Sequence, residues 1–218
     1  MTGSINLGFI FAILFLTLGP LKLIPTFYGA THALDSKTRL GLALKSTALA
    51  FLILVAATVV GSALATNWRV SREALLVTGG LLLLIGSLRI LSHALAPPAP
   101  HEPAPPADPA AKRPISIVVS PLAIPGIITP WGLVALLLFV SVAEDQHQLG
   151  GVVAMLVLNM LLNIVGMVFA GPIMRTIGVP AMSVLGWVFS ILQAALGITF
   201  LFRGVTAMLG LPWRPTPL

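Results

Sequence analysis

The sequence predicts an all-α transmembrane protein: a six-helix bundle of two inverted three-helix repeats, in which prolines break the first and fourth helices. Three observations predict this fold, namely long uncharged apolar segments, a proline-rich linker near the middle, and a similar proline cluster on each side of it. Of the 218 residues, 57% are hydrophobic and 8% are charged, whereas a soluble domain carries about 25% charged residues. Because a soluble domain must face water, the lipid bilayer is the predicted environment.

The long apolar segments predict six membrane spans, since one span needs about 20 apolar residues. The third segment contains Arg89, which lies about 22 Å along a helix from Ala74 and can snorkel to the far interface. The predicted spans are 6–28, 41–65, 74–95, 115–142, 149–172 and 180–204.

The linker, residues 96–114, contains eight prolines and six alanines. Such a segment favours extended polyproline II and cannot build a core, so we expect a solvated tether; a docking site for a proline-binding domain is the alternative. The linker divides the chain into a first repeat, 1–95, and a second repeat, 115–218. Each repeat has three spans, and because three is odd, the second repeat must enter the membrane from the opposite side.

The first span of each repeat carries the proline cluster that predicts a binding site. Proline removes a backbone donor and pushes the preceding residue out of helical geometry. Broken backbone is tolerated in a membrane only where protein or a water-filled cavity satisfies it, and matched breaks in two repeats point to a transport site; kinked helices with no ligand are the alternative. The predicted substrate-binding residues are Gly19, Pro20, Lys22, Pro25, Ser120, Pro121, Pro125, Gly126, Thr129 and Pro130.

A few polar residues inside the spans have two interpretations each. Lys22 either faces a substrate carboxylate or snorkels to the nearby interface. Asn159 and Asn163 lie four residues apart and therefore share one helix face, and Gln193 is a lone amide in the last span. These three amides either join helices by hydrogen bonds or line a cavity.

Several functional classes are disfavoured by what the sequence lacks. No Asp or Glu lies in a predicted span, so a carboxylate proton relay or an intramembrane aspartyl protease is hard to build. The chain has no cysteine, and its four histidines show no metal-ligand spacing. We therefore expect no catalytic residue, metal or cofactor, and no enzyme. The net charge of +6 fits loops beside anionic lipid rather than nucleic acid.

The two proline clusters resemble those of the MarC family of bacterial and archaeal membrane proteins, over nearly the whole chain to Gly204. The matching segments are Gly19–Pro25, Pro121–Pro125 followed by Thr129-Pro130, and Gly79–Leu84. Gly19 and Leu23 stand where the family motif has asparagine, Lys22 and Thr129 where it has glycine, and Arg203 where an acidic residue often precedes the final glycine. The resemblance implies six spans, kinship with LysE-like exporters and, as described for some members, neutral amino acid transport.

These observations predict a transporter or exporter of a small solute, with a neutral amino acid such as glycine, alanine or serine as the expected substrate. A membrane scaffold or regulator, or an organic-anion exporter that uses Lys22, are the alternatives. Seven basic residues in the odd-numbered loops against four on the other side predict periplasmic termini in the inner membrane. The sequence leaves the direction of transport, the coupling ion and homo-oligomer formation open.

Overall fold

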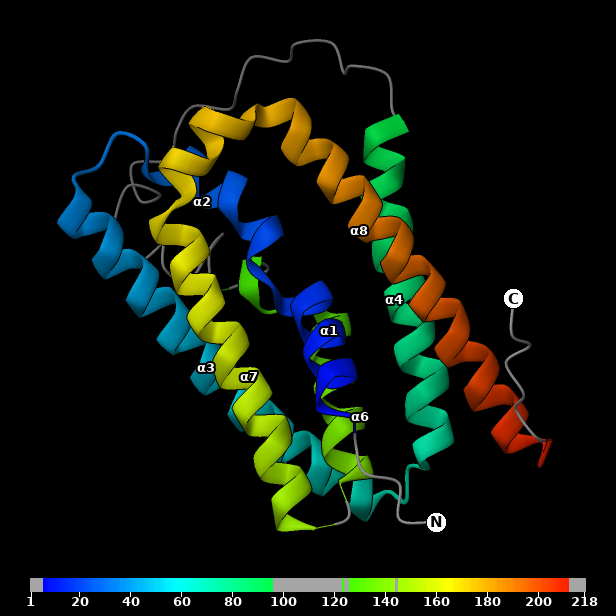
Figure 1. Cartoon of the computed structure of the whole chain (residues 1–218). Coiled ribbons are helices and arrows are strands. Elements are labelled where there is room, and N and C mark those ends of the chain that lie inside the picture. Colours follow the sequence, from blue (N-terminus) through cyan, green and yellow to red (C-terminus); the bar gives the residue numbers. More distant parts are fainter. Residues whose placement is uncertain (1–5, 96–122, 124–125, 144, 212–218) are drawn as a thin grey trace, which may run out of the picture.

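The computed structural model describes residues 6–95, 123, 126–143 and 145–211, and within these residues it contains helices and no strand (Figure 1). The predicted linker, 96–114, lies outside the described residues. The elements are α1 (Leu7–Leu18), η1 (Pro20–Lys22), α2 (Leu23–Thr31), α3 (Ser36–Asn67), α4 (Arg72–Leu95), α6 (Pro130–Val142), α7 (Gln146–Val168) and α8 (Ala170–Met208).

Helices α1 and α2 run in the same direction, and from α2 onward the described helices alternate in direction, so the start of α1 and the end of α8 lie at the same end of the bundle (Figure 1). Helices α1 and α6 lie in the centre, α3 packs with α7 on one side, and α4 packs along α8 on the other. Each helix of the first half therefore runs opposite to the helix in the corresponding position of the second half. The side chains of Ile10, Ile13 and Leu14 on α1 are fully buried, as expected of the central helix.

Five of the described helical segments are long and apolar enough to cross a membrane, and α6 is a shorter apolar helix of 13 residues. The predicted fourth span, 115–142, is described only in its last part. Apolar side chains such as Leu52, which is 65% exposed, and Val59, which is 62% exposed, lie on the outer faces of the helices. Such exposure is unfavourable in water but suits contact with lipid. The five long segments are Leu7–Thr31, Ser36–Asn67, Arg72–Ser92, Gln146–Val168 and Pro180–Met208.

The boundary between the last two spans differs from the prediction. Helix α7 ends at Val168, because Phe169 has φ −88° and ψ 5°, rather than continuing to residue 172. Helix α8 starts at Ala170 and is kinked at Gly178, whose φ of 76° and ψ of 165° favour glycine. The turns before the kink lie across the end of the bundle, and the long part of α8 follows from Pro180 (Figure 1).

Glycines bring α4 and α8 into backbone contact. A Cβ atom at Gly80 would lie 2.5 Å from the carbonyl oxygen of Gly197, and a Cβ at Gly197 would lie 2.8 Å from that of Gly80. The neighbouring Gly79 faces Val134 of α6 instead, 3.2 Å from its hypothetical Cβ. The Gly79-Gly80 pair thus lets α4 fit closely between α6 and α8.

Aspartates cap the second long helix of each half at opposite ends of the bundle. The Asp35 carboxylate accepts from the Thr38 amide at 3.1 Å at the start of α3, and the Asp145 carboxylate accepts from the Gln148 amide at 2.7 Å at the start of α7. Hydrogen bonding from Thr38 lowers the pKa of Asp35. Each cap satisfies an amide that has no partner inside its own helix.

Candidate functional site

The first helix breaks at Gly19, between α1 and η1, as the sequence predicts. Gly19 is extended, with φ −76° and ψ 169°, because Pro20 disfavours helical geometry in the residue before it. A Cβ atom at Gly19 would overlap the carbonyl oxygen of Phe15, so only glycine fits. Pro25, the other proline of this cluster, adds no second break. Pro25 is the third residue of α2, where an amide has no partner inside the helix anyway.

A second break lies at Thr129, directly before α6. The Ile128 amide donates to the Ala123 carbonyl at 2.9 Å, and Thr129 is then extended, with φ −119° and ψ 145°. Pro130 is the first residue of α6, a position where its missing N–H costs nothing. Both described breaks therefore consist of an extended residue followed by a proline. Ser120, Pro121 and Pro125 lie outside the described residues.

The two breaks are in direct contact. The Thr129 hydroxyl donates to the Thr17 carbonyl at 3.1 Å and accepts from the Gly132 amide at 3.2 Å. Gly132 packs so closely on Leu18 that a Cβ atom there would overlap the leucine side chain. Pro20 packs against α7, where a Cβ at Gly166 would lie 2.6 Å from the proline.

Asn163 of α7 binds a second main-chain carbonyl at the end of α1, that of the buried Leu18. Its side-chain Nδ2 donates to the Leu18 carbonyl at 2.7 Å and to the Asn159 carbonyl at 3.0 Å, while Asn159 Nδ2 donates to the Met155 carbonyl at 3.0 Å. Carbonyls only accept, so these bonds fix the orientation of both amides. Both side chains are fully buried, and neither Oδ1 atom has a hydrogen-bond partner in the part of the chain that the structure describes. Asn163 thus binds the break, whereas the side chain of Asn159 bonds only within α7.

Lys22 points into the bundle, toward groups of the second half. Its Nζ lies 3.4 Å from the Thr17 carbonyl oxygen, 3.3 Å from Gln193 Oε1 and 5.3 Å from the centre of the Trp131 ring. Gln193 is fully buried, and its Nε2 donates to the Leu83 carbonyl at 3.4 Å. These contacts favour the inward-facing interpretation of Lys22 over snorkelling.

A cavity of about 560 Å³ lies at the breaks. Five of the predicted residues line it, whereas Pro20, Pro130, Asn159, Asn163 and Gln193 are not among its lining residues. Its lining consists of Phe15, Leu16, Gly19, Leu21, Lys22, Pro25, Thr26, Ile90, Gly126, Thr129, Trp131, Met182, Gly186, Phe189 and Ser190.

Sequence reasoning missed the aromatic walls, Phe15, Trp131 and Phe189. Aromatic residues are ordinary in apolar spans, and only Trp131 carried a signal, because it directly follows the Thr129-Pro130 break. Of the described residues that line the cavity, Lys22 is the only charged one. The cavity therefore offers one cation, several hydroxyls and an apolar wall. Within the described residues no group of three or more His, Cys, Asp or Glu side chains could hold a metal ion.

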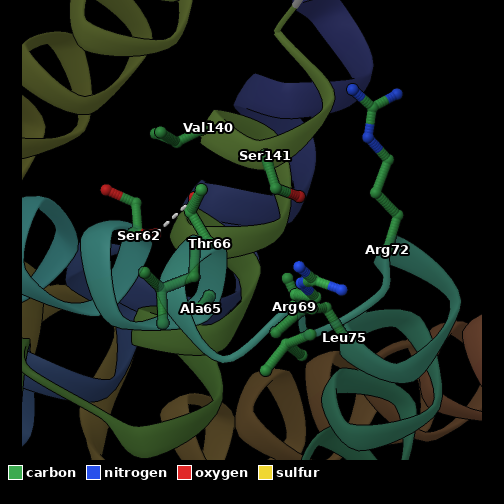
Figure 2. A pocket seen from close by; sticks show the side chains of 10 residues that line it. Ser62, Ala65, Thr66, Arg69, Arg72, Leu75, Val140 and Ser141 are labelled. Atoms are coloured by element: carbon green, nitrogen blue, oxygen red, sulfur yellow. Dashed lines mark hydrogen bonds between the residues drawn. The ribbon is translucent and has the colours of Figure 1, made fainter.

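A second cavity, of about 480 Å³, lies at one end of the bundle where α3 meets α4 (Figure 2). Arg69, Arg72 and three hydroxyl residues contribute to its lining. Arg69 has φ 53° and ends α3 in a position that favours glycine. Both arginines are exposed, and no residue of either break lines this cavity. We therefore place the candidate site at the breaks.

The fold and the site define an integral membrane protein of apolar helices, two of which are interrupted where they enclose a cavity. The chain belongs to the MarC family of integral membrane proteins, whose profile matches residues 6–209. It is 28% identical over 202 residues to a UPF0056 membrane protein of Archaeoglobus fulgidus, covering 91% of this chain and 92% of the relative. It is 24% identical over 198 residues to a UPF0056 membrane protein of Methanocaldococcus jannaschii, covering 91% and 86%. No solved structure matches.

Proposed function

We propose that this protein transports or exports a small solute, with a neutral amino acid such as glycine, alanine or serine as the substrate. The observation that carries the proposal is the cavity at two contacting helix breaks, with the Lys22 ammonium in its lining. Interrupted helices at a cavity are a recurring way to bind a solute inside a membrane. No catalysis and no cofactor enters the proposal.

The polar groups of the cavity suit a zwitterion. Lys22 is a donor for a carboxylate, and the lining contributed by the described part of the chain contains no acidic residue. The hydroxyls of Thr26 and Ser190 donate to the carbonyls of Lys22 and Gly186, so their oxygen lone pairs remain for a substrate ammonium. The carbonyls of Thr17 and Leu18 already have donors from the second half. We therefore expect hydroxyls, rather than those carbonyls, to bind the ammonium.

We propose that the two halves form an inverted repeat, which would support a transport mechanism. Corresponding helices of the two halves run in opposite directions (Figure 1). The second long helix of each half starts at a capping aspartate, Asp35 for α3 and Asp145 for α7. A cavity between two such halves can open alternately to either side of the membrane. We propose the inner membrane as the location and the periplasm for both termini. Reporter fusions at Leu218 that are active only in the cytoplasm would overturn the assignment of the termini.

The test is uptake by the purified protein in proteoliposomes, with labelled glycine, alanine and serine. We expect saturable uptake of these amino acids, and leucine and phenylalanine in the same panel measure the side-chain preference. Empty liposomes measure leakage. A properly folded protein that neither binds nor moves any of these amino acids would contradict the proposal and favour the scaffold or regulator alternative.

A second candidate is export of an organic anion, and the charge of Lys22, which has no acidic partner within the described residues, favours it. The same proteoliposomes distinguish the two candidates when small carboxylates without an amino group, such as acetate and lactate, are added to the panel. Uptake of these anions without uptake of glycine, abolished in a Lys22→Met variant, would select the anion exporter. If alanine and serine inhibit glycine uptake but acetate and lactate do not, the substrate is the zwitterion.

A further inference from the structure

The Lys22 ammonium lies among three neutral groups that each favour a cation. The Thr17 carbonyl and Gln193 Oε1 are 3.4 and 3.3 Å from Nζ, and the Trp131 ring centre is 5.3 Å away. The three groups come from α1, α8 and α6, so the fold assembles them from both halves. No salt bridge to Lys22 occurs among the described residues, and within them the groups that face its charge are these three neutral ones.

Physical chemistry explains why these groups select positive charge. The last carbonyls of α1 carry the negative end of the helix dipole, and the ring face of tryptophan attracts cations within about 6 Å of its centroid. None of the three groups titrates near neutral pH. Transporters use carbonyls at a helix break in the same way to hold a dissolved cation.

Hydrogen bonds that do not involve Lys22 fix the orientation of the two oxygen ligands. Gln193 Nε2 donates to the Leu83 carbonyl at 3.4 Å, and because a carbonyl can only accept, the amide oxygen must face Lys22. Gln193 is fully buried, which restricts its rotation. The Thr17 carbonyl is fixed independently by its hydrogen bond from Thr129.

We infer that the Thr17 carbonyl, Gln193 Oε1 and the Trp131 ring form a monovalent-cation site that Lys22 fills as a tethered cation. When Lys22 is shortened, the site binds a free alkylammonium or a small monovalent ion. The Lys22 ammonium thus supplies one positive charge to the cavity, and no cation from solution has to bind there. This last consequence rests on the proposed function: wild-type uptake needs no dissolved Na⁺ or K⁺ at this site.

The experiment is chemical rescue of Lys22→Ala in the full-length purified protein. Alanine keeps Cβ, so the missing group is n-propylammonium. We expect the Tm of the variant to fall by roughly 5 °C, as loss of one charge-assisted contact set predicts. Addition of n-propylammonium chloride should restore most of that loss, whereas 1-propanol, of similar size but uncharged, should not. Equal effects of n-propylammonium and 1-propanol would overturn the inference.

Two matched variants test the site itself. Lys22→Met fills the space of the lysine stem, so n-propylammonium should not restore its Tm. Lys22→Ala combined with Gln193→Leu lacks the amide oxygen, so the rescue should be lost; full rescue in this double variant would contradict the proposed ligands. If Lys22→Ala yields no folded protein in ordinary buffer, purification with n-propylammonium should restore the yield, and purification with 1-propanol should not.

The readouts separate this inference from the proposed function. Rescue of Tm without any amino acid uptake retains the cation site and rejects transport of that substrate. Uptake by the wild type without rescue of Lys22→Ala rejects the cation site and retains transport. In active proteoliposomes, uptake by the wild type should be unchanged when choline replaces Na⁺ and K⁺, while uptake by Lys22→Ala should increase when n-propylammonium is supplied.

Discussion

The Thr129 hydroxyl donates a 3.1 Å hydrogen bond to the main-chain carbonyl of Thr17, and this bond joins the break of the first half to that of the second. The same oxygen caps α6 by accepting from the Gly132 amide. Thr129→Val keeps the shape and removes both bonds. We expect a loss of about 2–3 kcal/mol in stability, measured by thermal unfolding, and reduced uptake.

Thr58→Val is the matched control for that variant. Thr58 is also buried, but its hydroxyl donates at 2.6 Å to the Leu54 carbonyl of its own helix. In Thr58→Val that carbonyl still accepts from a main-chain amide of the helix. We expect a loss of less than about 1 kcal/mol. Equal losses in the two valine variants would show that the bond between the breaks adds no more to the free energy of unfolding than a hydroxyl bond within one helix.

The two asparagines of α7 should respond differently to leucine. Asn163→Leu removes the donor that satisfies the Leu18 carbonyl at the break, and a buried carbonyl left without a partner costs about 1–3 kcal/mol. Asn159→Leu removes only a bond within α7 together with an oxygen that has no partner, so stability should stay nearly unchanged. The Tm values of the two variants check this order, and a larger loss in Asn159→Leu would contradict it.

Gly186 offers a way to narrow the cavity without disturbing the breaks. It lines the cavity, and a Cβ atom there would meet no other atom within 4 Å. Gly186→Leu should reduce uptake of serine more than uptake of glycine while the Tm changes little. Gly41 of α3 also has open space around a Cβ and does not line the cavity, so Gly41→Leu should leave uptake intact. Unchanged substrate preference in Gly186→Leu would place the solute elsewhere.

Arg69 sits where the chain ends α3 with a glycine-type turn. The Val70 amide donates to the Ala65 carbonyl at 2.8 Å, and Arg69 has φ 53°. Gly210 occupies the same position at the end of α8, with φ 67°. We expect Arg69→Gly to stabilise the protein by about 0.5–1 kcal/mol, and Gly210→Arg to destabilise it by a similar amount. A lower Tm for Arg69→Gly would show that the guanidinium makes a compensating interaction.

The sequence predicts the helices well because charge and apolar length are local properties. The break at Gly19-Pro20 was also predictable, since a proline restricts its neighbour wherever it occurs. The start of α2 just before Pro25 was not predictable, because the pattern alone does not locate a helix start so close to a break. Similarly, the apolar pattern through residue 172 gave no sign that Phe169 ends α7.

The site residues beside prolines were predictable, because proline changes the backbone locally. The residues that only pack against the cavity were not. Gly19, Gly126 and Thr129 flank prolines, and the structure places all three at the cavity. Phe15 and Phe189 come from distant parts of the chain, and nothing in their neighbourhoods separates them from other apolar residues. Gln193 was identified as a polar residue, but its pairing with Lys22 across 171 positions is a consequence of tertiary structure.

The end of α1 also constrains the order in which the protein can mature. A ribosome delivers Thr17 and Leu18 to the membrane long before it makes Thr129 and Asn163, which later donate to their carbonyls. Until that point these two carbonyls need water or the insertion machinery as a substitute, because hydrocarbon offers no donor. The amino-terminal half is therefore a nascent intermediate that can settle into its final form only after α7 has entered the membrane.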